Sequence, residues 1–216
     1  MTPNRVTAAR VAAAFAAVAL FNFGADALSA DLAAVLLTVA AIALDGLDGY
    51  LARSRGLATP LGAQIDILGD RVVENLFFTF FAVSGLISLW VPVLFFARGT
   101  VTDFFRGLAA RSGRNGFERN SMLDTWWGRT LVASRASRGA YAVLKCVCFC
   151  CLGILLPLRH LPLAQFNVWL LSAGQALTGI TAAFCVVRAI PVIWEGRRHF
   201  AAARKARPVM AAGVVR

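Results

Sequence analysis

The chain has 216 residues, of which 59% are hydrophobic and 15% are charged, and its mean hydropathy is +0.69. Soluble domains contain less apolar sequence, so this composition excludes an ordinary soluble protein and indicates a membrane protein. The net charge of +11 comes mainly from arginines that flank apolar stretches, and no nucleic-acid-binding motif surrounds them. We therefore expect partners among membrane lipids with anionic headgroups and phosphorylated substrates, and no nucleic acid.

Apolar stretches along the chain predict an all-α fold with about six transmembrane helices. A bilayer core about 30 Å thick is crossed by roughly 20 helical residues. The expected spans are residues 6–23, 31–53, 61–88, 90–110, 138–158 and 165–194. They would form one membrane domain over residues 1–199, followed by a basic cytoplasmic tail over residues 200–216.

Basic residues gather in alternate connections between these spans. One side would carry Arg5 and Arg10, the group from Arg53 to Arg71, the arginines from 98 to 138 and those from 188 onward. The opposite connections are nearly bare of basic residues, apart from Arg159 and His160. Since positive residues accumulate on the cytoplasmic side, we expect a multi-pass protein of the inner membrane with both termini in the cytoplasm.

Four of the eleven acidic residues lie where the second predicted span ends and the third begins: Asp45, Asp48, Asp66 and Asp70. Within each span the two aspartates are three or four residues apart and therefore share a helix face. An ionised carboxylate in a membrane helix is costly unless it is paired, hydrated or bound to a cation, so the cluster indicates a functional site. The alternative is that these aspartates have a structural role and form ion pairs with Arg53 or Arg71.

Carboxylates without nearby histidine or cysteine ligands form a hard oxygen site. Such a site suits Mg²⁺ or Mn²⁺, and two ions are plausible. Divalent ions of this kind commonly act on phosphoryl substrates. A divalent-cation transporter would also need an intramembrane acidic cluster and stays open as an alternative, although a transport path would place polar groups at successive depths.

Residues 45–70 read DGLDGYLARSRGLATPLGAQIDILGD and match the signature DxxDGxxAR, eight residues, GxxxDxxxD at every fixed position. This signature belongs to the CDP-alcohol phosphotransferases, which the chain therefore resembles. The resemblance implies a six-helix membrane enzyme whose site opens to the cytoplasmic face and to lipid, and it makes a homodimer the expected assembly.

The same resemblance implies a role for each matched position. The four aspartates would hold the metal ions, and Asp70 would also act as the general base. The positions implied to lie against the nucleotide or its diphosphate are Gly49, Ala52, Arg53 and Gly62.

The opening PNRVTAAR resembles the PNxxTxxR stretch near the start of phosphatidylglycerophosphate synthases. It places Asn4, Thr7 and Arg10 on one side of a short helix, and Asn4 and Thr7 are expected to contact the substrate. Alternatively, these residues only anchor the first helix at the membrane interface.

The implied reaction moves the phosphatidyl group of CDP-diacylglycerol to an alcohol, while Asp70 takes the acceptor's proton and CMP leaves. Candidate acceptor-binding residues are Arg98, Arg106, Arg135, Arg138 and Lys145. Guanidinium groups bind phosphate bidentately, which favours glycerol 3-phosphate or an inositol phosphate over serine. The arginines could instead merely follow the positive-inside bias, and Asp103 could neutralise Arg106.

Two further segments are polar or basic. In the connection over residues 111–129, Trp126 and Trp127 are expected to anchor the chain at the membrane interface. The sequence beyond Trp194 predicts a basic surface helix or tail that is attracted to anionic lipid.

Overall fold

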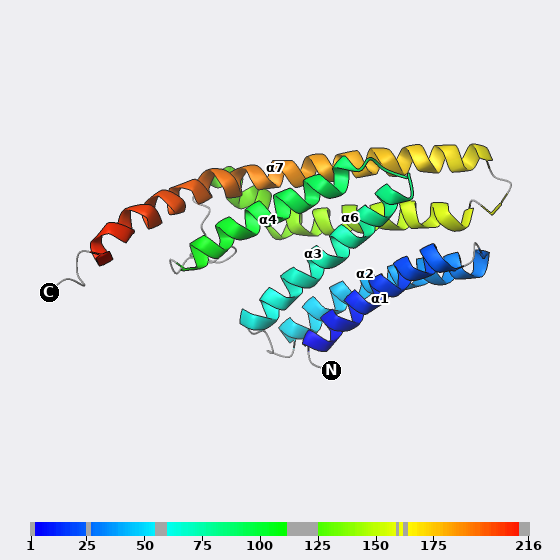
Figure 1. Ribbon diagram of the computed structural model, residues 1–216, viewed down its shortest axis with the longest axis horizontal. Coiled ribbons are helices and arrows are strands. Elements are labelled where there is room, and N and C mark those ends of the chain that lie inside the picture. Colours follow the sequence, from blue (N-terminus) through cyan, green and yellow to red (C-terminus); the bar gives the residue numbers. More distant parts are fainter. Residues whose placement is uncertain are drawn as a thin grey trace. The chain divides into compact units, whose positions relative to one another are not determined.

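The computed structural model describes residues 3–24, 27–54, 60–111, 125–158, 160–161 and 164–211. They form α1 (Pro3–Phe23), α2 (Leu28–Ser54), α3 (Pro60–Val83), α4 (Trp90–Arg111), α5 (Trp126–Gly128), the π-helix η1 (Arg129–Ala133), α6 (Arg135–Leu158) and α7 (Ala164–Ala211) (Figure 1). At the helix positions 3–4, 45–54, 60–61, 63, 109–111, 133, 135, 164–165 and 198–211 only the backbone is described. No strand occurs within these ranges, so the all-α prediction is confirmed.

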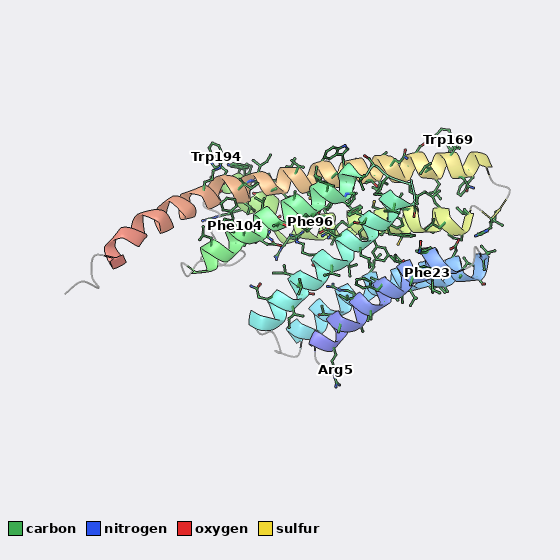
Figure 2. The ribbon with its side chains drawn as sticks, viewed as in Figure 1. Arg5, Phe23, Phe96, Phe104, Trp169 and Trp194 are labelled. Atoms are coloured by element: carbon green, nitrogen blue, oxygen red, sulfur yellow. The ribbon has the colours of Figure 1, made fainter. Side chains whose placement is uncertain are left out.

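Several of these helices have the length and composition of membrane spans. Three stretches of the described chain are long and apolar enough to cross a bilayer: Arg5–Phe23, Trp126–Leu158 and Phe166–Arg197. Leu28–Leu44 is a shorter apolar helix, whereas α3 and α4 are as long as spans but carry more charge. The side chains of Trp169 and Trp194 project away from α7 (Figure 2), and many other large apolar side chains are exposed. Exposed apolar surface of this extent fits lipid, and the chain is an all-α membrane protein.

Two helix ends differ from the predicted spans. The prediction that the third span reaches residue 88 is wrong, because α3 ends at Val83. There Gly85 adopts φ +74°, and the backbone N–H groups of Gly85 and Leu86 donate to the carbonyls of Ala82 and Phe81. This Schellman pattern needs a left-handed residue, which glycine supplies without a Cβ clash. At the other end, α7 continues to Ala211, so residues 200–211 of the predicted tail are helical.

The chain divides into two compact units, and α4, α6 and α7 contribute residues to both. Unit 1 consists of Met1–Phe96 and Leu144–Thr181, and unit 2 consists of Ala97–Val143 and Ala182–Arg216. Within unit 1, α1 packs along α2 and also along α3 (Figure 1).

The core of unit 1 is an aromatic seam formed by Phe77, Phe78 and Phe81 of α3, Phe95 of α4 and Phe149 of α6. The ring centroids of Phe78 and Phe95 are 4.3 Å apart, and Phe149 lies 5.2 Å from Phe77 and 4.9 Å from Phe78. Rings at these distances stabilise one another beyond simple burial. The seam therefore fixes the packing of α3 against α6 directly after the polar part of α3.

The core of unit 2 joins η1 to α7 through Val132 and Val192. An added Cβ at Gly196 of α7 would lie 2.6 Å from the ring of Phe105 in α4, so this glycine permits a close helix approach. One residue earlier, the buried Glu195 accepts hydrogen bonds from the backbone N–H and the hydroxyl of Thr125. These contacts hold the start of α5 against α7.

Candidate functional site

Asp66 and Asp70 lie on the same side of α3, as their spacing of about one helical turn requires. Their side chains are 44% and 45% exposed, so solvent reaches both acids. Gly62 lies one turn before Asp66 on the same face. The predicted helix face shared by Asp66 and Asp70 is therefore confirmed as a local arrangement.

The guanidinium of Arg10 in α1 bridges these two carboxylates. Its Nη1 atom lies 2.9 Å from Oδ1 of Asp70, and its Nη2 atom lies 3.5 Å from Oδ1 of Asp66. Nη2 also donates a hydrogen bond of 3.4 Å to the backbone carbonyl of Asp66. Since the Arg10 side chain is only 2% exposed, it reaches both acids from the interior of unit 1.

Gly69, between the two acids, is the point at which α1 crosses α3. A Cβ at this position would lie 2.6 Å from Cγ2 of Thr7 and 2.8 Å from Nη2 of Arg10. Only a residue without a side chain leaves room for both groups. Thr7 is buried at this crossing, and its expected contact with the substrate stays a prediction.

Much of the predicted site lies at positions whose side chains fall outside the described part of the chain: Asn4, Asp45, Asp48, Gly49, Ala52, Arg53 and Arg135. The backbone of α2 continues to Ser54, so Asp45 and Asp48 share one side of that helix. Among the side chains that are described, no group of three or more histidine, cysteine or acidic residues could hold a metal ion. Asp66 and Asp70 nevertheless supply two partly exposed carboxylates, the donor type that Mg²⁺ and Mn²⁺ prefer.

Glu74, one turn beyond Asp70, is buried between two cations. Its Oε2 atom lies 3.0 Å from Nη1 of Arg71, and its Oε1 atom lies 3.3 Å from Nζ of Lys145 in α6. Lys145 was predicted to bind the acceptor, and the structure pairs it with Glu74 within unit 1. Glu74 was not among the predicted site residues, although an acid inside the apolar run VVENLFF is costly in a membrane helix and indicates a charged partner.

A Glu74→Gln substitution is expected to lower the free energy of unfolding by about 3–5 kcal/mol, because it leaves Lys145 and Arg71 without this carboxylate. Thermal unfolding in detergent measures the change. The double variant Glu74→Gln/Lys145→Gln removes both charges of the Glu74–Lys145 pair and should recover part of the lost free energy of unfolding. An unchanged melting temperature in the single variant would show that the ion pair contributes little.

In unit 2, two guanidinium groups converge on the ring of Tyr141. The guanidinium carbon of Arg188 in α7 lies 5.3 Å from the ring centroid, and that of Arg98 in α4 lies 6.0 Å from it. Arg188 is 5% exposed, also lies over the ring of Phe184, and donates a hydrogen bond of 2.5 Å to the hydroxyl of Ser137. Cation–π contacts and neutral acceptors therefore surround Arg188.

This guanidinium pair has unused hydrogen-bonding capacity. The Nε atoms of Arg98 and Arg188 are buried and have no hydrogen-bond partner, and among the described residues neither side chain pairs with a carboxylate. Two like charges so placed would be stabilised by an anion with several oxygens. Arg188 was not among the predicted acceptor-binding residues. Its place in the apolar run AAFCVVRAIPVIW nevertheless marks it as a charge within a membrane helix.

The other predicted acceptor residues of unit 2 have different surroundings. Nη1 of Arg106 lies 3.3 Å from Oδ1 of Asp103, so the alternative that Asp103 pairs with Arg106 is confirmed. Arg138 is exposed on α6. The two predicted acceptor residues on α4 therefore differ. Arg98 faces an aromatic ring and another arginine, whereas the charge of Arg106 is offset by Asp103.

Comparison with known proteins identifies the family. The model of the CDP-alcohol phosphatidyltransferase family matches residues 1–187, which include both acidic segments, Arg10 and Arg98. No curated protein gave a match. The match confirms the resemblance seen in residues 45–70 and covers most of the chain. The chain therefore belongs to the CDP-alcohol phosphatidyltransferase family, membrane transferases of phospholipid biosynthesis that move the phosphatidyl group of a CDP-alcohol to an acceptor.

Proposed function

We propose that this enzyme transfers the phosphatidyl group of CDP-diacylglycerol to a phosphorylated alcohol, with glycerol 3-phosphate as the first candidate, and releases CMP. The observation that supports a phosphorylated acceptor is the pair of guanidinium groups of Arg98 and Arg188 over Tyr141. A phosphate group offers more oxygens and more negative charge to two guanidinium groups than the carboxylate of serine, which also brings an ammonium group of the same sign as the arginines. Inositol phosphate carries the same recognised group and is the alternative acceptor.

We propose that the metal-binding residues are Asp45, Asp48, Asp66 and Asp70, and that they bind a pair of Mg²⁺ or Mn²⁺ ions. The partial exposure of the Asp66 and Asp70 side chains supports this assignment. Bound divalent ions would offset negative charge on the diphosphate oxygens. In the same proposal, Gly49, Ala52, Arg53 and Gly62 lie along the nucleotide diphosphate, and Asn4 and Thr7 bind nearby.

The proposed chemical step uses Asp70 as the general base. Its carboxylate accepts the proton of the acceptor hydroxyl, and the hydroxyl oxygen forms a bond to the lipid-side phosphorus. The bond between that phosphorus and the bridging oxygen breaks, and CMP leaves with the electron pair. No covalent enzyme intermediate is required, so positioning and electrostatics supply the rate enhancement.

The proposed setting is the inner membrane, with both termini and the active site on the cytoplasmic side and two copies forming a homodimer. The distribution of arginines along the chain supports this orientation. A site on that side has access to water-soluble acceptors made in the cytoplasm as well as to the lipid substrate.

The acceptor is tested by measuring CMP release from CDP-diacylglycerol with one candidate alcohol at a time. We expect turnover with glycerol 3-phosphate in Mg²⁺ or Mn²⁺, little with glycerol as the unphosphorylated control, and none after chelation by EDTA. Turnover with serine, together with failure of glycerol 3-phosphate and inositol phosphate, would refute the proposed acceptor. Undiminished turnover in EDTA would refute the metal requirement.

A further inference from the structure

We propose that Arg10 is a positioning residue, which holds the Asp66 and Asp70 carboxylates from their buried side so that their open oxygens face a divalent cation. This inference rests on the proposed metal role of the two aspartates and adds a residue outside the aspartate signature. The side chain of Arg10 is 2% exposed, whereas the side chains of the two acids are 44% and 45% exposed. The arginine and a cation would therefore approach the carboxylates from opposite sides.

The contacts of Arg10 use a limited part of each carboxylate. Both ion pairs involve the Oδ1 atoms, at 2.9 Å for Asp70 and 3.5 Å for Asp66. A carboxylate has about four acceptor positions on two oxygens, so these contacts with Arg10 do not by themselves occupy every acceptor position of either side chain. Arg10 can therefore bind the acids and leave them able to bind a cation.

The shape of the guanidinium explains why an arginine suits this position. Its nitrogen atoms form a planar, rigid fork. Nη1 therefore contacts Asp70, while Nη2 contacts Asp66 and the backbone of α3. Two carboxylates at i and i+4 repel each other, and a single cation between them lowers that repulsion. The ammonium group of a lysine is a point charge and would not fix both side chains in one geometry.

Gly69 provides the space for this contact. Nη2 of Arg10 and Cγ2 of Thr7 would lie 2.8 Å and 2.6 Å from a Cβ at this position. A methyl group there would force α1 away from α3 or displace the guanidinium from Asp66. The distance between α1 and α3 is therefore coupled to the orientation of the two acids.

Groups that orient metal ligands from behind typically change metal affinity by about 10- to 100-fold when they are removed. The test is Mn²⁺ binding to the full-length purified protein in detergent without substrate, followed by the electron paramagnetic resonance signal of free Mn²⁺. We expect Arg10→Gln to weaken Mn²⁺ binding by about 10- to 100-fold and Arg10→Lys to recover only part of that loss. The matched control is Arg5→Gln, since Arg5 is an exposed arginine on the same helix (Figure 2).

Unchanged Mn²⁺ affinity in Arg10→Gln would overturn the proposal, and tighter binding would overturn it by showing that the arginine competes with the cation. If Arg10→Gln fails to fold, the Gly69→Ala variant decides, because it keeps every charge and disturbs the same contact. Normal Mn²⁺ binding by Gly69→Ala would then count against the positioning role. A wild-type protein that binds no Mn²⁺ would instead refute the proposed metal role itself, which separates the two failures.

Discussion

An Asp70→Asn substitution is expected to lower the rate of CMP release by about 10²- to 10⁴-fold, the usual contribution of a general base. Asparagine has nearly the same size as aspartate, but its amide cannot accept the proton of the acceptor hydroxyl. The substitution also removes the charge that lies 2.9 Å from Nη1 of Arg10. A single-turnover assay with saturating CDP-diacylglycerol and glycerol 3-phosphate measures the chemical step.

The matched control for this variant is Asp103→Asn. Asp103 is also a partly exposed aspartate on a helix, and it also forms an ion pair with an arginine, Arg106. It should retain most of the activity, and both variants should show a cooperative thermal transition. If Asp70→Asn releases CMP at a near-normal rate, Asp70 is not the base.

An Arg188→Gln substitution is expected to raise the KM for glycerol 3-phosphate by about 10- to 100-fold. A hydrogen bond to a charged group contributes about 1.5–3 kcal/mol, and each 1.4 kcal/mol changes affinity about tenfold. The KM for CDP-diacylglycerol should stay unchanged, because the guanidinium pair of Arg98 and Arg188 is proposed to bind only the acceptor. Initial rates at varied concentrations of each substrate separate the two effects.

The matched control is Arg197→Gln, which removes an exposed arginine from the same helix. Arg188→Lys keeps the charge but loses the planar fork, so it should recover only part of the acceptor affinity. Because Arg188 also donates to the hydroxyl of Ser137, thermal unfolding must accompany the kinetics. A lower kcat with an unchanged acceptor KM would indicate a purely structural role.

Local spacing was enough to predict which acidic residues share a helix face. Asp66 and Asp70 are four residues apart in a continuous helix, so backbone geometry alone puts them on one side of α3. The pairing of Asp103 with Arg106 was predictable for the same reason. Interactions within one helical turn depend little on the rest of the fold.

Contacts between distant segments were not predictable from spacing. Arg10 meets Asp66 across 56 positions, and the contact depends on the helix crossing at Gly69. The positive-inside pattern treats Arg98 and Arg106 alike, yet one lies over Tyr141 and the other pairs with Asp103. Tertiary packing decides which partner an arginine in a membrane helix contacts, and a single sequence carries no direct information on that packing.

The length of α7 sets a condition on how it lies in a bilayer. Its 48 residues span about 72 Å at about 1.5 Å per residue, whereas the hydrocarbon layer is about 30 Å thick. More than half of an upright α7 would therefore stand among headgroups or in water, and tilting changes which residues those are. Since the helix is continuous, any such adjustment to bilayer thickness moves Arg188 and Glu195 together.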